Sequence, residues 1–236
     1  LLLQTDFVRT CRETALNLKA KIPVLVGTPL DSESNRALPG NGVVRCGDVP
    51  REVTRKQLLP TYDVFDEARY FASDERPGIA RTIAGLDIGV TICEDAWQHS
   101  GETPSDYNSD PISQIMEWGR QGVNLDATVN LSASPYHANK AKVRIDVARS
   151  AARSLNHPFL LANQVGGNDD LLFDGRSIVA WPNGDIVIAP AWKEGILVVD
   201  LEGPDKATWI GDGELQIISP NETLELSNDD LLDAVT

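Results

Sequence analysis

One cysteine stands in a setting that suits acyl transfer. Cys93 lies in the stretch Thr-Ile-Cys-Glu-Asp, at the end of an apolar run and directly before two acidic residues. A thiolate attacks a carbonyl carbon well once a base or a nearby cation lowers the thiol pKa below its free value of about 8.5. A cysteine on an apolar strand is more often a small buried hydrophobe, whereas the two adjacent carboxylates favour a functional role. From the residues alone, nucleophile and core residue both remain open.

Histidine is the other residue type that could supply a base. His99, His137 and His157 stand in unrelated contexts, without an obvious orienting Asp or Asn. Because neutral structural histidines are common, we expect all three to be structural, and a Cys–His arrangement of the protease type is the weaker enzymatic hypothesis. Residues 166–170 lack the lysine–serine pair of a phosphate loop and the spacing of a calcium loop, so they are predicted to form an ordinary loop.

Short apolar strands alternate with helices along most of the chain. The predicted helices are 5–20, 112–120 and 139–155, and the predicted strands are 22–27, 43–46, 52–55, 85–93, 127–131, 159–163, 177–181, 185–188 and 196–201. This alternation predicts a layered α/β fold with its site at strand ends. Cys93 then ends a strand, Lys56 ends a hairpin, and Cys11 lies in the core. Residues 202–226 are polar and are predicted to form an irregular linker or arm.

Composition excludes several classes of protein. Lys and Arg number 21 against 35 for Asp and Glu, and the net charge of −14 repels nucleic acid and anionic membrane surfaces. No apolar run reaches the roughly 18–20 residues that span a bilayer, and no signal peptide opens the chain. The three cysteines form no CxxC pair, zinc spacing or secreted disulfide framework. We therefore expect a soluble cytoplasmic protein without a metal, nucleic-acid or membrane partner.

Four sequence blocks follow one another over nearly the whole chain. They read RKQLLPTYDVFDE at 55–67, TICEDAW at 91–97, NLSASP at 130–135, and NQVGG at 163–167 with FDGRS at 173–177. Together they resemble the glutaminase domain of glutamine-dependent NAD synthetases, which are carbon–nitrogen hydrolases of the nitrilase superfamily. The resemblance implies an αββα sandwich, in which two mixed β-sheets carry helices outside. It also implies a Glu-Lys-Cys triad whose thiol attacks the side-chain amide of glutamine, so that ammonia leaves and water then releases glutamate.

The resemblance assigns catalytic roles to individual residues. Cys93 is the implied nucleophile and Lys56 the triad lysine, while Glu67 matches an accessory glutamate that orients the lysine or relays protons. Lys56 and the backbone N–H of Glu94 would hold the developing oxyanion, and one such donor is worth about 3 kcal/mol in related systems.

The resemblance also assigns substrate contacts. The Glu94 side chain would bind the α-amino group of glutamine, and Tyr62 and Phe65 would wall the pocket, although core packing explains these two aromatics equally well. Ser134 and Lys140 would help to hold glutamine, with lysine where other members have arginine and its bidentate grip. Asp174 and Ser177 are expected to shape a turn instead.

Two departures from the family pattern, the absence of the triad glutamate and of a synthetase domain after Thr236, lead us to expect a fragment. The triad glutamate would precede Leu1, because Glu13 falls in the first helix and Glu33 in a polar loop. A chain this short should then show little or no hydrolysis, since the proton shuttle is missing. We expect the hydrolase domain at 1–219, without its first strand and helix, and a linker or the start of a synthetase domain at 220–236.

The resemblance implies partners as well. The hydrolase domain itself would need no cofactor, while ATP and magnesium would bind to a synthetase domain after Thr236. Glutamine, that synthetase domain and further copies of the same chain, in a homo-oligomer, are the expected partners. A free-standing amidase for another small amide and a catalytically silent interaction domain are the alternatives.

Overall fold

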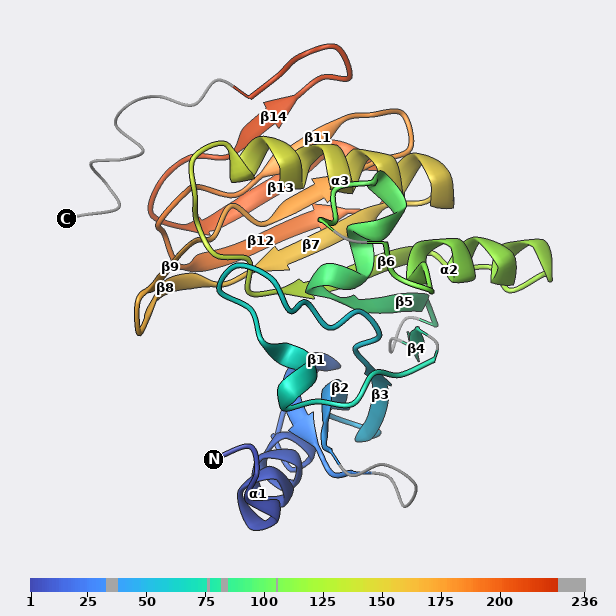
Figure 1. The fold of residues 1–236 in the computed structure, drawn as a ribbon. Coiled ribbons are helices and arrows are strands. Elements are labelled where there is room, and N and C mark those ends of the chain that lie inside the picture. The colour runs from blue at the N-terminus through green and yellow to red at the C-terminus, as the bar shows by residue number, and fades with distance from the viewer. Residues whose placement is uncertain (33–37, 76, 82–84, 105, 225–236) are drawn as a thin grey trace. The chain divides into compact units, whose positions relative to one another are not determined.

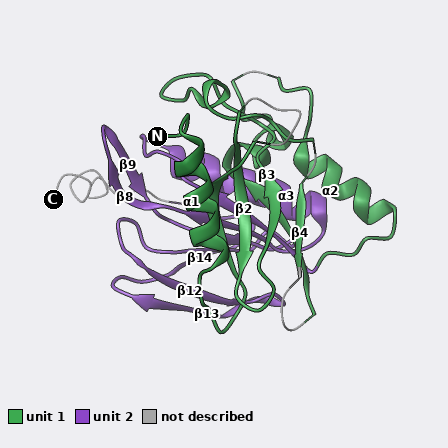
Figure 2. Cartoon of the chain, turned by 90° about the horizontal axis from the view of Figure 1, so that it is seen from below, with its two compact units in different colours: residues 1–125 green, residues 126–236 purple. Residues whose placement is uncertain are grey.

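Figure 1 shows the computed structural model, which describes residues 1–32, 38–75, 77–81, 85–104 and 106–224. The chain divides into two compact units, residues 1–125 and 126–236, which we call unit 1 and unit 2 (Figure 2). Both units combine strands with helices, so the predicted α/β class is confirmed. Within the described residues, no helix is long and apolar enough to cross a membrane. Residues 225–236 of the predicted linker or synthetase start lie outside the described residues.

Unit 1 consists of a helix-covered meander and a second strand pair. Its elements are α1 (Thr5–Leu16), β1 (Val24–Leu30), β2 (Gly40–Cys46), β3 (Arg51–Arg55), η1 (Glu67–Arg69), β4 (Gly78–Arg81), β5 (Asp87–Ile92), η2 (Cys93–Ala96), η3 (Gln98–Ser100) and α2 (Pro111–Arg120). Strands β1, β2 and β3 pair antiparallel in that order, and β4 pairs antiparallel with β5. Helix α1 packs Ala15 and Leu16 against Leu30, Val44 and Cys46, because its apolar residues recur with the period of a helix.

A close backbone approach joins the strands that lead into the candidate site. A Cβ atom on Gly78 of β4 would lie 2.3 Å from the carbonyl oxygen of Val53 and 2.7 Å from Cβ of Thr54, both on β3. Only glycine permits this approach without displacing the backbone. Strand β3 leads directly to Lys56, and β5, the partner of β4, leads directly to Cys93. The packing therefore brings the ends of two strands together within unit 1.

The described residues of unit 2, 126–224, form one helix, a mixed sheet and two further strand pairs. Its elements are β6 (Ala127–Ser132), α3 (Lys140–Leu155), β7 (Phe159–Asn163), β8 (Val165–Asn168), β9 (Leu171–Asp174), β10 (Ile178–Ala180), β11 (Ile186–Ile188), β12 (Gly195–Asp200), β13 (Gly203–Gly211) and β14 (Gln216–Ile218). Strands β6 and β7 are parallel, while β7, β10, β11 and β14 follow antiparallel. Helix α3 packs on β7 and β10. The β12–β13 ribbon packs Leu197, Val199 and Ala207 onto Val179, Trp181 and Val187.

A buried ion pair ties α3 to the end of β9. Arg144 and Asp174 are both 0% exposed and form a salt bridge through Nη2 and Oδ2. Arg144 Nη1 also donates to the carbonyl oxygen of Ser134 at 3.4 Å. Asp174, which we expected to shape a turn, does precede the left-handed residues Gly175 and Arg176, but its side chain anchors the helix. Asp174 also pairs with Arg176 Nη1 at 3.5 Å, so removal of Asp174 would be the more destabilising change, because it leaves the fully buried Arg144 without its carboxylate.

Three sequence predictions are wrong. Residues 202–226, predicted to be irregular, contain β13 and β14. The exposed residues of β13 are polar, and its strand conformation comes from pairing with β12 and from packing Ala207 on the core. Residues 166–170, predicted to be a loop, lie largely in the β8–β9 hairpin, whose turn falls at Asp169 and Asp170. Cys11, predicted to be core, is only partly buried, whereas Cys46 is 0% exposed.

The half-buried His157 makes the stability of unit 2 depend on pH. Its Nε2 lies 2.8 Å from Thr128 Oγ1, and burial, opposed by nearby Asp126, lowers the pKa of His157 from 6.5 to about 4. Between these values the unfolded chain binds more protons, so the free energy of unfolding falls as pH drops from about 6.5 to 4. Because the ring is partly exposed, we expect a loss of about 1–2 kcal/mol.

Urea unfolding of the wild type and of His157→Gln at pH 7 and pH 4.5 measures this loss. The variant should lose less stability than the wild type on acidification. His137→Gln is the matched control, since His137 is exposed, and it should follow the wild type. Equal pH dependence in all three proteins would contradict the assignment.

Candidate active site

Cys93 lies in a strained turn between a strand and a helical turn. It directly follows β5, opens η2 and has a φ of 46°, a left-handed conformation that is uncommon for residues other than glycine and costs about 1–3 kcal/mol. Cys93 is reduced and partly exposed. Cys46 behaves differently, because it is fully buried and its Sγ donates to the Ala15 carbonyl oxygen at 2.9 Å. The strain and the exposure together favour the nucleophile over the core residue.

Lys56 forms a buried ion pair with Glu67. The Lys56 side chain is 1% exposed, and its Nζ lies 2.6 Å from Glu67 Oε1. Its backbone is fixed at both ends, since its N–H donates to the Asn41 carbonyl oxygen at 2.7 Å and its carbonyl oxygen accepts from the N–H of Asp74 at 3.1 Å. Asn41 Nδ2 donates to the other carboxylate oxygen of Glu67 at 3.4 Å. The ammonium group is therefore held in one place.

The charge state of Lys56 follows from its neighbours. Burial by itself lowers the pKa of Lys56, but the charges of Cys93 and Glu67, with smaller contributions from the Glu67 hydrogen bond and Asp95, raise it above 10.5 overall. Lys56 is therefore an ammonium ion at neutral pH and cannot act as a base there. By reciprocity, a cation that interacts with Cys93 favours its thiolate.

Glu94 presents a buried carboxylate that two tyrosines hold. It is 4% exposed, and its Oε1 accepts from the hydroxyl groups of Tyr62 at 2.6 Å and Tyr107 at 3.3 Å. Burial and the Glu94 charge raise the pKa of both phenols, so they remain donors. Across the described residues, no lysine, arginine or histidine pairs with Glu94. A buried carboxylate without a cationic partner is costly unless a ligand supplies the charge.

The ring of Phe65 completes the aromatic side of this cluster. It meets the Tyr62 ring edge to face, with ring centroids 5.7 Å apart and an interplanar angle of 76°. Both rings are partly exposed, as expected for a pocket wall rather than for the core. Their contact with substrate remains a prediction.

Asp95 joins the two segments that carry Lys56 and Cys93. Its Oδ1 accepts from the backbone N–H groups of Gln57 at 3.1 Å and Leu58 at 2.9 Å, and its Oδ2 accepts from that of Ile92 at 3.1 Å. Burial raises the pKa of Asp95 to about 7, opposed by these three donors and the charge of Lys56. One carboxylate thus bridges the residue before Cys93 and the two residues after Lys56.

Two predicted substrate residues belong to unit 2. Ser134 is 3% exposed and its N–H donates to Asn163 Oδ1 at 2.9 Å. Lys140 is the first residue of α3, and its N–H donates to the His137 carbonyl oxygen at 3.1 Å. Their predicted contacts with glutamine remain predictions.

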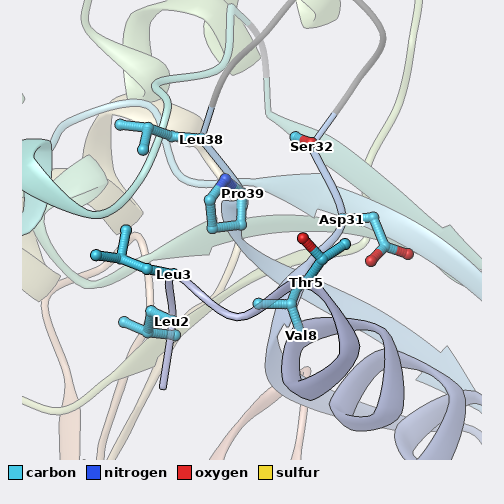
Figure 3. Close-up of a pocket in the computed structure, with 8 residues that line it drawn as sticks. All are labelled: Leu2, Leu3, Thr5, Val8, Asp31, Ser32, Leu38 and Pro39. Atoms are coloured by element: carbon cyan, nitrogen blue, oxygen red, sulfur yellow. The ribbon is translucent and has the colours of Figure 1, made fainter.

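Other candidate features do not coincide with this cluster. His99 lies 3.0 Å from Asp110 and His157 contacts Thr128, as expected for structural histidines. A pocket of about 90 Å³ in unit 1 is lined by residues other than the predicted site residues (Figure 3), namely Leu2, Leu3, Thr5, Val8, Asp31, Ser32, Leu38 and Pro39. In the part of the chain that the structure describes, no group of three or more His, Cys, Asp or Glu side chains could hold a metal ion.

Sequence reasoning missed three members of the cluster. Asn41 contacts both the backbone of Lys56 and the side chain of Glu67, Tyr107 holds Glu94, and Asp95 bridges the two segments. Asp95 had a signal, because an acidic residue two positions after a candidate nucleophile is unusual next to an apolar strand. Asn41 and Tyr107 lie outside the matching motif blocks, and only the tertiary structure reveals them.

Comparisons with known proteins agree with this geometry. The sequence profile of the carbon–nitrogen hydrolase family matches residues 51–210. The glutamine-dependent NAD(+) synthetase of Synechocystis is 36% identical over 213 residues, which cover 86% of this chain and 37% of the relative. The chain thus spans about a third of the length of the curated relatives that it matches.

Solved structures show the same fold. The glutamine-dependent NAD+ synthetase of Acinetobacter baumannii superposes with a TM-score of 0.63 at 29% identity, over 78% of this chain and 32% of that protein. An amidase of Nesterenkonia sp. AN1, from the nitrilase superfamily, superposes with a TM-score of 0.56 at 15% identity, over 80% of this chain and 64% of that protein. That amidase carries the acetamide moiety of fluoroacetamide covalently on its active-site cysteine. These likenesses confirm the predicted nitrilase-like αββα fold, and with the profile match they place the chain in the carbon–nitrogen hydrolase family.

Proposed function

We propose that Cys93 is the nucleophile of a glutaminase, an enzyme that hydrolyses the side-chain amide of glutamine. The observation that carries the proposal is the buried Lys56–Glu67 pair, whose ammonium interacts with the charge of Cys93. The strained backbone of Cys93 is the second support, because strain of this kind concentrates at functional sites.

The proposed reaction consists of two acyl transfers. The Cys93 thiolate attacks the amide carbon, the new carbon–sulfur bond forms, and the oxyanion receives hydrogen bonds from the Lys56 ammonium and the Glu94 backbone N–H. The carbon–nitrogen bond then breaks, and the nitrogen takes up the proton that the Cys93 thiol lost on ionising, so that ammonia leaves. Water attacks the thioester carbon, the carbon–sulfur bond breaks, and a proton from the water returns to the sulfur, so that glutamate and the free thiol are released. The sum is glutamine plus water giving glutamate plus ammonia, with Glu67 keeping Lys56 in place throughout.

Glu94 favours an amino-acid amide over a simple amide. Its buried carboxylate uses one oxygen for both tyrosine hydroxyls and has no cationic partner among the described residues. The α-ammonium group of glutamine would supply that charge in a hydrogen bond of the strong, charge-assisted kind. A simple aliphatic amide would leave the carboxylate buried and uncompensated, which argues against the alternative of a free-standing amidase for such amides.

The proposal also covers the use of the ammonia that glutamine hydrolysis releases. The relatives are named glutamine-dependent NAD(+) synthetases, and we propose that the ammonia serves the ATP-dependent amidation of deamido-NAD, with ATP and magnesium bound by a synthetase domain. Ser134 and Lys140 are proposed to hold the substrate carboxylate. A cytoplasmic location and a homo-oligomer complete this proposal.

Covalent labelling tests Cys93 directly. A diazoketone analogue of glutamine should add to Cys93 in a 1:1 ratio, as intact-protein and peptide mass spectrometry would show, because the thiolate displaces nitrogen from the activated carbon. Cys93→Ala should not be labelled, whereas Cys11→Ala, which removes another partly exposed cysteine, should be labelled like the wild type. A catalytically silent domain would give no adduct at Cys93.

The role of Glu94 has a test of its own. Glu94→Gln should slow labelling by the glutamine analogue roughly 10- to 100-fold, since a hydrogen bond to a charged group is worth about 1.5–3 kcal/mol. Labelling by the same diazoketone without its amino group should change little. Glu117→Gln on α2 is the matched control, because Glu117 is 50% exposed and should leave both rates unchanged. An equal loss with both reagents would refute substrate selection by Glu94.

A further inference from the structure

Asp95 bridges the segment that follows Lys56 and the turn that carries Cys93, and it has no role in the proposed reaction steps. It is 2% exposed, and it follows Cys93 by two residues on η2. The Asp95 carboxylate accepts hydrogen bonds from three backbone N–H groups, two in the segment after Lys56 and one in the residue before Cys93. The Asp95 side chain therefore contacts the backbone next to Lys56 and next to Cys93. The proposal gives it no contact with the substrate.

These bonds hold two segments that are far apart in sequence. Gln57 and Leu58 lie 38 and 37 residues from Asp95 along the chain, so no local structure fixes their distance from the Cys93 turn. The hydrogen bond from the Ile92 N–H fixes the backbone directly before Cys93, whose φ is strained. Strain of this size persists only where the surroundings over-determine the backbone. The Asp95 carboxylate supplies that constraint from within the turn.

The chemical identity of the residue also matters. All three partners are donors, and a carboxylate has acceptor sites for each of them. An asparagine of the same shape would direct its NH₂ group at one or more donors, which leaves buried N–H groups unsatisfied at a cost of about 1–3 kcal/mol. Electrostatically, however, the negative charge of Asp95 opposes a nearby thiolate. An acid placed beside a nucleophile despite this repulsion points to a geometric role.

We propose that Asp95 is a positioning residue that sets the place of the Lys56 ammonium relative to the Cys93 thiol and thereby the reactivity of that thiol. The inference rests on the proposed function only in taking Cys93 as the nucleophile and Lys56 as its cation. Asp95 acts through these two residues and takes no part in bond making or bond breaking.

The pH dependence of Cys93 alkylation separates positioning from charge. Iodoacetamide labelling of the Cys93 peptide between pH 6 and pH 10, followed by mass spectrometry, gives the midpoint at which the thiol ionises. If Asp95 positions Lys56, Asp95→Asn should raise this midpoint by about one pH unit, because the thiolate loses its aligned cation. If Asp95 acts only through its charge, the same variant should lower the midpoint.

Two further variants complete the test, one as a control at another carboxylate and one as a second change at Asp95. Asp110→Asn removes another carboxylate that accepts a backbone N–H, that of Ser113 at 3.0 Å at the start of α2, and should lower stability without moving the midpoint. Asp95→Glu keeps the charge but lengthens the side chain, so it should also raise the midpoint, and it decides the matter where Asp95→Asn does not fold. A midpoint that stays unchanged or falls in the folded Asp95 variants overturns the proposal. Because iodoacetamide is no glutamine analogue, this outcome is independent of whether glutamine is the substrate.

Discussion

The rest of the candidate site depends on keeping an ammonium group charged while it is almost completely buried. Lys56 is 1% exposed, and desolvation alone would favour its neutral form. Glu67 offsets this cost at 2.6 Å, and the charges of Cys93 and Asp95 add to the effect. One of these interactions is with Cys93, so in the proposed mechanism the charges that keep Lys56 protonated also favour the thiolate.

The carboxylates around Lys56 divide the remaining tasks. Glu67 neutralises the ammonium, Asp95 accepts only from backbone N–H groups, and Glu94 accepts from two phenols. Within the described residues of unit 1, the salt bridge that these three carboxylates form is the one between Glu67 and Lys56. The site therefore carries more negative than positive charge before substrate binds. An amide that brings its own ammonium group would correct that imbalance, which makes an amino-acid amide the best match.

The sequence predicted where Lys56 and Cys93 lie in the fold, but not the contacts that hold them there. The motif blocks around Lys56 and Cys93 located both residues at strand ends, where β3 and β5 place them. The sequence could not predict that Asn41 contacts Glu67 or that Tyr107 contacts Glu94, because neither residue lies in a motif and both contacts depend on the tertiary structure. The β13 strand was missed for a related reason. Its exposed residues are polar, and its strand conformation comes from pairing with β12 and packing on Trp181 and its neighbours.

A crystal structure of the Cys93→Ser variant with glutamine bound would test the central claim most directly. The account predicts that the amide carbon lies next to the introduced hydroxyl group, and that the α-amino nitrogen lies within about 2.7–3.2 Å of the Glu94 carboxylate. A glutamine whose amino group contacts a different residue, or whose amide lies away from residue 93, would contradict it.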